Sequence, residues 1–114
     1  MLKAIVNDAI AEFEKVVGTN ELNSGQRKSV IVDEVPILLF RIGDVYYAIE
    51  DLCTHDGQPL TDGPLTDGKI TCPRHGAQFD LETGKALCMP ATEPVETFEV
   101  QERDDGVYVK RRAV

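Results

Sequence analysis

Residues 53–84 read CTHDGQPLTDGPLTDGKITCPRHGAQFDLETG, and they hold both histidines and two of the three cysteines of the chain. The four residues lie in two short segments, Cys53-Thr54-His55 and Cys72-Pro73-Arg74-His75. Each segment therefore offers one thiolate and one imidazole. Two cysteines with two histidines are ligands of tetrahedral zinc, and also of the [2Fe–2S] clusters in which histidine replaces cysteine at one iron. The pattern predicts a metal centre with four ligands: Cys53, His55, Cys72 and His75.

The length and charge of the chain restrict its other functions. Its 114 residues suffice for one domain with a modest core, and a hydrophobic content of 42% favours a folded chain over a disordered one. The formal net charge of −8 argues against nucleic-acid binding, because a basic surface supplies that affinity. An acidic surface instead favours transient docking on a basic partner, since opposite charges speed the encounter.

The cysteine count and the N-terminal sequence predict a cytoplasmic protein without membrane contact. Three cysteines cannot all pair, so a disulfide framework is not expected. Residues 1–15, MLKAIVNDAIAEFEK, lack the layout of a signal peptide. No apolar stretch reaches the roughly 20 residues that span a bilayer. In the cytoplasm, thiolates stay reduced and free to bind metal.

The apolar pattern changes near the start of the chain. Apolar residues in 2–13 follow helical spacing: Leu2, Ile5, Val6, Ala9, Ile10 and Phe13. Residues 1–12 are therefore predicted to be an N-terminal extension with a short helix, either a cap on the domain's own core or a partner-binding helix. Residues 13–114 are predicted to be the metal-binding domain.

Beyond Gly18, short β-rich runs alternate with turn residues. The runs are Ser29–Val32, Pro36–Ile42, Val45–Ile49, Lys69–Thr71, Thr97–Gln101 and Val107–Lys110, and the breaks are Gly43-Asp44, Asp67-Gly68, Glu82-Thr83-Gly84 and Asp104-Asp105-Gly106. Short strands with frequent turns predict an all-β antiparallel sandwich or small barrel. Both ligand segments fall between predicted strands, and a proline-rich stretch at 87–94 follows them, where it can cover the site.

The residues around the ligands resemble the two cluster-binding loops of Rieske proteins. The matching segments are CTHDGQPL at 53–60 and CPRHGAQFDLETGKAL at 72–87, and MPATEPVETFEV at 89–100 is similar to the proline loop of soluble Rieske-type ferredoxins. The resemblance spans residues 13–110 and implies a Rieske-type antiparallel β-sandwich with a small cluster-binding subdomain of two loops. It also implies one [2Fe–2S] cluster with two cysteine and two histidine ligands.

The resemblance also implies roles for single residues. Cys53 and Cys72 would ligate one iron through sulfur, and the two histidines would ligate the other through imidazole. Gly57 and Gly76 would let the loop backbone approach the inorganic sulfides and donate N–H hydrogen bonds to them. Cys88 is expected to be a small buried residue beside the cluster rather than a ligand.

A structural zinc site is the alternative to a cluster. Zinc knuckles usually pair cysteine with cysteine and histidine with histidine, whereas each segment here pairs cysteine with histidine. The acidic residues near the ligands, among them Asp56, are expected to be turn residues that only add negative charge to this face of the protein.

The loops differ from those of high-potential Rieske subunits of respiratory complexes. Those subunits carry a cross-loop disulfide, and the corresponding positions here are Gln58 and Arg74. They also carry a serine and a tyrosine that donate hydrogen bonds to cluster sulfurs, where this chain has Ala77 and Phe79. Each missing hydrogen bond removes stabilisation from the more negative, reduced state. We therefore expect a potential near ~−150 mV, at the low end of the Rieske range.

The resemblance implies a one-electron carrier rather than an enzyme. A Rieske oxygenase also needs a mononuclear iron held by two histidines and a carboxylate, and this chain has no further histidine. The implied partners are an NAD(P)H-dependent flavin reductase and a terminal oxygenase that hydroxylates aromatic rings. The alternative is a Rieske-like small subunit of a nitrite reductase or another multi-subunit oxidoreductase.

Overall fold

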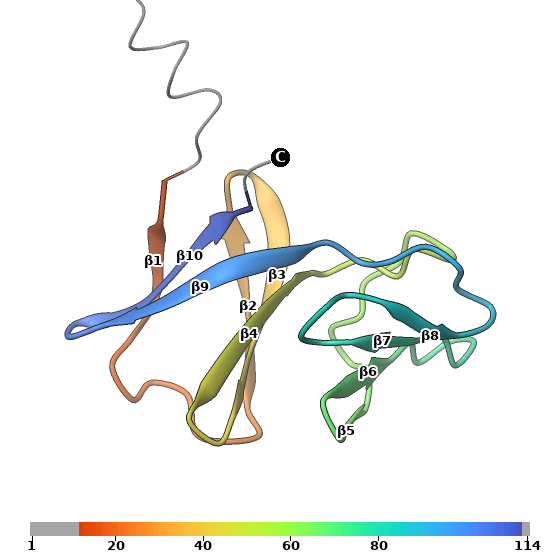
Figure 1. Cartoon of the computed structure of the whole chain (residues 1–114), viewed down its shortest axis with the longest axis horizontal. Helices are drawn as coiled ribbons and strands as arrows, with labels where there is room; N and C mark the ends of the chain where they lie inside the picture. Colours follow the sequence, from red (N-terminus) through yellow and green to blue (C-terminus); the bar gives the residue numbers. More distant parts are fainter. Residues whose placement is uncertain (1–11, 113–114) are drawn as a thin grey trace, which may run out of the picture.

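The structure, a computed structural model, describes residues 12–112, which form two antiparallel β-sheets (Figure 1). The large sheet has the strand order β1-β10-β9-β4-β3-β2, with β1 Glu14–Gly18, β2 Arg27–Val32, β3 Val35–Ile42, β4 Val45–Glu50, β9 Thr97–Arg103 and β10 Gly106–Arg111. The small sheet has the order β5-β6-β7-β8, with β5 Leu65–Thr66, β6 Lys69–Thr71, β7 Gln78–Asp80 and β8 Ala86–Cys88. Residues 53–95 leave the large sheet after β4, build the small sheet and return to β9 (Figure 1).

The all-β prediction is confirmed for the described residues. Between residues 12 and 112 there is no helix, and so none that could cross a membrane. The predicted N-terminal helix lies almost wholly in residues 1–11, outside the described part of the chain. All six predicted strands occur, as parts of β2, β3, β4, β6, β9 and β10, whereas β1, β5, β7 and β8 were not predicted.

Strand β3 links the two hydrophobic cores. Successive side chains of a strand point to opposite faces of its sheet. Ile37 and Leu39 therefore pack into one core and Leu38 and Phe40 into the other, and all four side chains are fully buried. This explains the unbroken apolar run in a sheet whose other strands are only partly buried.

The first core lies within the large sheet, which curls so that its edge strands β1 and β2 approach each other. Its buried members come from six strands and the segment after β1: Val17, Leu22, Val32, Ile37, Leu39, Ala48, Phe98, Val107 and Val109. The second core lies between the large sheet and the small sheet with its loops: Leu38, Phe40, Ile49, Cys53, Leu60, Ile70, Cys72, Ala77, Phe79, Leu81, Ala91 and Val95. The second core therefore contains both predicted cysteine ligands.

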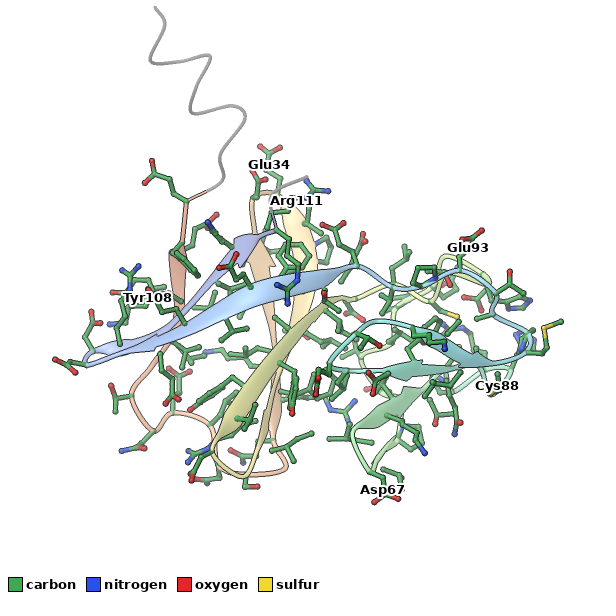
Figure 2. The ribbon with its side chains drawn as sticks, in the orientation of Figure 1. Glu34, Asp67, Cys88, Glu93, Tyr108 and Arg111 are labelled. Atoms are coloured by element: carbon green, nitrogen blue, oxygen red, sulfur yellow. The ribbon has the colours of Figure 1, made fainter. Side chains whose placement is uncertain are left out.

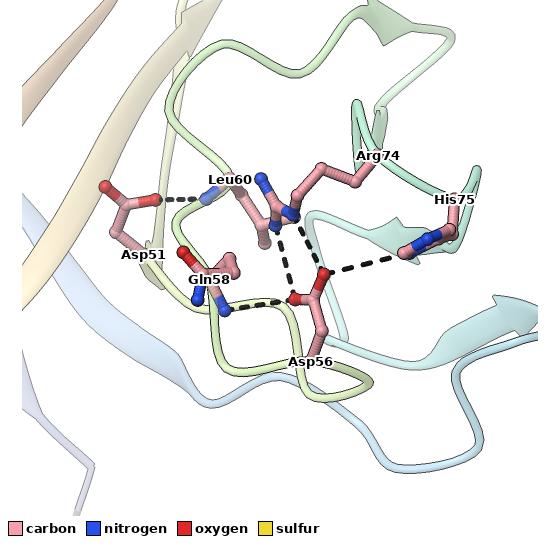
Figure 3. A network of polar contacts seen from close by, with 6 residues as sticks. All are labelled: Asp51, Asp56, Gln58, Leu60, Arg74 and His75. Atoms are coloured by element: carbon pink, nitrogen blue, oxygen red, sulfur yellow. Dashed lines mark hydrogen bonds and ion pairs between the residues drawn. The ribbon is translucent and has the colours of Figure 1, made fainter.

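Polar contacts attach the segment after the first ligands to the large sheet. Arg27 of β2 donates through Nη1 to the carbonyl oxygens of Thr61, at 2.9 Å, and Gly63, at 2.7 Å. Asp51, directly after β4, accepts a hydrogen bond of 2.6 Å from the backbone N–H of Leu60 (Figure 3). These contacts hold the ligand-bearing part of the chain in a defined position on its scaffold.

Candidate metal centre

Two loops bring the four predicted ligands together. We call residues 53–58, which follow β4, the first loop, and residues 72–77, between β6 and β7, the second loop. The imidazoles of His55 and His75 lie edge to face, with ring centroids 5.4 Å apart and planes at 83°. Cys53 and Cys72 pack in the same buried cluster, where the Cys72 sulfur helps to raise the pKa of the Cys53 thiol. The ligands predicted from the sequence therefore meet at one place.

The two loops have the same backbone hydrogen bonds, although their cysteine–histidine spacings differ. The N–H of Cys53 donates to the carbonyl of Gln58, at 2.7 Å, and that of Cys72 to the carbonyl of Ala77, at 2.7 Å. Each pair is five positions apart, so each loop closes on itself directly after its glycine. The loops are thus equivalent turns that offer a cysteine from the first position and a histidine from near the tip.

The expected role of the two glycine N–H groups is wrong. Gly57 donates to the carbonyl of Cys53, at 2.7 Å, and Gly76 to that of Cys72, at 3.0 Å, so both groups already have partners inside their loops. Both glycines have a positive φ, 73° and 79°, which closes the turn and strains residues with a side chain. The positive φ is therefore a conformational reason for glycine at both positions, and no protein atom lies within 4 Å of a Cβ added at either one.

The predicted cysteine ligands are buried, whereas the predicted histidine ligands are exposed. Cys53 and Cys72 are 0% and 1% exposed and form part of the second core. Both histidines are exposed, and the side chain of His75 retains 60% of its accessible surface. The sulfur donors therefore lie inside the protein and the imidazole donors at its surface.

Burial also affects the protonation of the Cys53 thiol. Removal from water raises the pKa of the Cys53 thiol; backbone N–H groups of His55 and Asp56 oppose this, and the nearby Cys72 sulfur adds to it. Without metal, Cys53 is therefore a neutral thiol near neutral pH. Metal binding must displace its proton, as is usual for thiolate ligands.

Asp56 lies in a turn, as expected, but the expectation that it only adds negative charge is wrong. One ligand atom each of Cys53, His55 and Asp56 lie within 4.8 Å of one another, so the carboxylate is close enough to be considered as a ligand. It is, however, occupied: Arg74 donates to both of its oxygens, and the backbone N–H of Gln58 donates to Oδ1 (Figure 3). Arg74 holds the pKa of Asp56 well below its usual range. The carboxylate is therefore an ion-pair partner and not a free ligand.

The stretch at 87–94 contacts both loops, in agreement with its expected position. Thr54 of the first loop donates to the carbonyl of Glu93, at 2.7 Å, and Cys88 lies with its sulfur 3.5 Å from the carbonyl oxygen of Gly76 in the second loop. Figure 2 shows Cys88 and Glu93 at the same end of the molecule. The predicted burial of Cys88 is wrong, because it ends β8, an edge strand whose outer side faces solvent.

The donor set fits a [2Fe–2S] cluster with mixed ligation. Such a cluster has one iron bound by two thiolates and one bound by two imidazoles. The buried pair of sulfurs and the exposed pair of imidazoles match that division. A single zinc ion would need no such separation of its ligands by type.

Comparison with known proteins agrees with the kind of cofactor that this donor set fits. The family described as Rieske [2Fe-2S] domain matches residues 12–99. The chain is 34% identical over 100 residues to the anthranilate 1,2-dioxygenase ferredoxin subunit of Burkholderia cepacia, covering 88% of this chain and 93% of that protein. It is 40% identical over 80 residues to the 3-phenylpropionate/cinnamic acid dioxygenase ferredoxin subunit of Escherichia coli K12, covering 68% of this chain and 76% of the relative.

A solved structure of the complex of reduced oxygenase and oxidized ferredoxin in carbazole 1,9a-dioxygenase contains a chain with the same fold. The TM-score is 0.81 at 35% sequence identity, and the match covers 90% of this chain and 95% of that one.

Proposed function

This chain belongs to the Rieske [2Fe-2S] domain family, and from this we propose that it is the ferredoxin component of a dioxygenase system that hydroxylates aromatic rings. It carries electrons one at a time from a flavin reductase to a terminal oxygenase and is not itself the enzyme. The observation that carries the proposal is the exposed histidine pair above the buried cysteine pair. The small-subunit alternative is not favoured, because the relatives are ferredoxin subunits of dioxygenases.

We assign the cluster to Cys53, His55, Cys72 and His75, in a domain of residues 13–114. When bound, a Rieske cluster takes up one electron and releases it again. The second core keeps water from the cysteine sulfurs, and the exposed histidines provide the edge that a partner can approach. Because this edge serves both partners, the protein docks on the reductase and on the oxygenase in turn.

The proposed location is the cytoplasm. All three cysteines are free thiols, which suits a reducing compartment. The reductase would use a nicotinamide cofactor there as its source of electrons.

Electron transfer is expected to depend on salt. With a net charge of −8, the protein is attracted to basic docking surfaces, and this attraction is screened at high ionic strength. We expect the second-order rate constant for reduction by the cognate reductase to fall about tenfold between about 0.05 and 0.5 M salt. Stopped-flow absorbance of the cluster measures this rate. A rate independent of salt would contradict electrostatic docking.

The potential is expected to rise when the missing hydrogen bonds are restored. We expect Ala77→Ser with Phe79→Tyr to raise it by more than about 100 mV from a wild-type value near −150 mV, because each hydroxyl stabilises the reduced state. Protein-film voltammetry gives the value. Ala48→Ser, a polar change in the first core, is the matched control and should leave the potential unchanged. A wild-type potential above about +100 mV would contradict the interpretation of these loops.

A further inference from the structure

A bidentate ion pair joins the two ligand loops. Nε of Arg74 donates to Oδ2 of Asp56 at 2.8 Å, and Nη2 of Arg74 donates to Oδ1 at 3.3 Å (Figure 3). Asp56 directly follows His55, and Arg74 directly precedes His75. The pair therefore fixes the backbone beside both imidazoles, in the planar fork geometry that arginine forms with carboxylates.

A backbone donor also orients the carboxylate. The backbone N–H of Gln58 donates to Oδ1 of Asp56 at 3.0 Å, within the first loop. Nδ1 of His75, in the second loop, lies 3.9 Å from Oδ2 of Asp56, which is beyond hydrogen-bonding distance. The side chains of Asp56 and Arg74 are 18% and 32% exposed, so the pair is screened less than a fully exposed one.

Resting on the proposed function, we propose that Asp56 and Arg74 form an ionic latch that holds the two loops closed and slows loss of the cluster. The protein has no disulfide, since all three of its cysteines are free, and the ion pair spans the two loops instead. The two are positioning residues: they act through the loops that carry the ligands. An ionic latch, unlike a covalent one, is weakened by salt.

The test is a double-mutant cycle on the holoprotein. Asp56→Asn, Arg74→Gln and the double variant are bleached with a ferric chelator, and the loss of visible absorbance is followed over time. We expect each single variant to lose its cluster about tenfold faster than wild type, because a charge-assisted bidentate contact is lost. The double variant should bleach no faster than the single variants, since both remove one interaction.

Arg111→Gln is the matched control. Arg111 also donates to both oxygens of a carboxylate, that of Glu96, but on β10, away from the ligand loops. The Arg111→Gln substitution changes the net charge by the same amount as Arg74→Gln, and the variant should lose its cluster at the wild-type rate.

Two further measurements separate a latch from general destabilisation. Raising salt from about 0.05 M to about 1 M should accelerate bleaching of wild type but hardly affect the variants, which have no ion pair to screen. Arg74→Lys, which keeps the charge without the fork, should restore part of the lifetime.

The results distinguish failure of the proposed function from failure of the latch. A wild-type protein that binds no iron would overturn the proposed function. Two results would overturn the latch but leave the proposed function standing. In the first, wild type holds a cluster and the single variants bleach at the wild-type rate. In the second, the double variant bleaches about a hundredfold faster than wild type, which means that the two residues act independently.

Discussion

Replacing Cys53 or Cys72 by serine is expected to abolish cluster binding, whereas Cys88→Ser leaves it intact. The first two are buried together in the second core. A serine hydroxyl keeps nearly the same volume but ionises far less readily than a thiol, so it cannot replace a thiolate ligand. Cys88 is exposed at the end of an edge strand, and its sulfur lies near the carbonyl of Gly76 and the side chain of Gln78.

Iron content and EPR of the dithionite-reduced protein measure this expectation. Wild type and Cys88→Ser should carry two irons per chain and give the rhombic signal, with a low average g, of mixed histidine and cysteine ligation. Cys53→Ser and Cys72→Ser should be colourless, with iron reduced at least about tenfold. A zinc-loaded, colourless wild-type protein would overturn the cluster assignment. Loss of iron in Cys88→Ser would show that the donor set is wrong.

The four candidate ligands could be identified in the sequence because they are rare residues at close spacing. Only two histidines occur, and each stands beside a cysteine among turn-forming glycine and proline. The long strands were equally predictable, since their apolar and β-branched runs end at turns such as Gly43-Asp44 between β3 and β4, where Gly43 has a positive φ.

The short strands other than β6 left no such pattern. β5 has two residues, and β7 and β8 have three each, too few for an alternation to be recognised. β1 is interrupted by an irregular register between Lys15 and Val17. The turn between β2 and β3 uses positive φ at Asp33 and Glu34, neither of which is glycine, so composition does not reveal it.

The ion pair between the loops was missed for a different reason. Asp56 and Arg74 are 18 positions apart, and only the folded loops bring them within 2.8 Å. Their opposite charges next to the two histidines were the available signal. The exposure of Cys88 could not be predicted from the sequence either, because it depends on the strand order, which leaves β8 at an edge of its sheet.

Gly84→Ala is expected to destabilise the protein strongly. Gly84 has a φ of 78°, and a Cβ there would lie 2.1 Å from the carbonyl oxygen of Val95. That approach is built into the fold, because the N–H of Val95 donates to the carbonyl of Gly84 at 2.8 Å. This contact secures the chain where it leaves the stretch at 87–94 and returns to β9. Backbone strain and the clash together should cost about 3 kcal/mol or more, which lowers the melting temperature by at least about 10 °C.

Gly68→Ala separates the two contributions to this cost. Gly68 has nearly the same φ, 74°, but an added Cβ would meet nothing within 4 Å. It should therefore show only the backbone cost, about 1 kcal/mol. Thermal unfolding followed by far-UV circular dichroism compares the two. Because the stretch at 87–94 contacts both ligand loops, Gly84→Ala should also bleach faster than Gly68→Ala. Equal losses of stability would mean that the chain at Val95 can move away from Gly84, so that this contact does not hold the ligand loops in place.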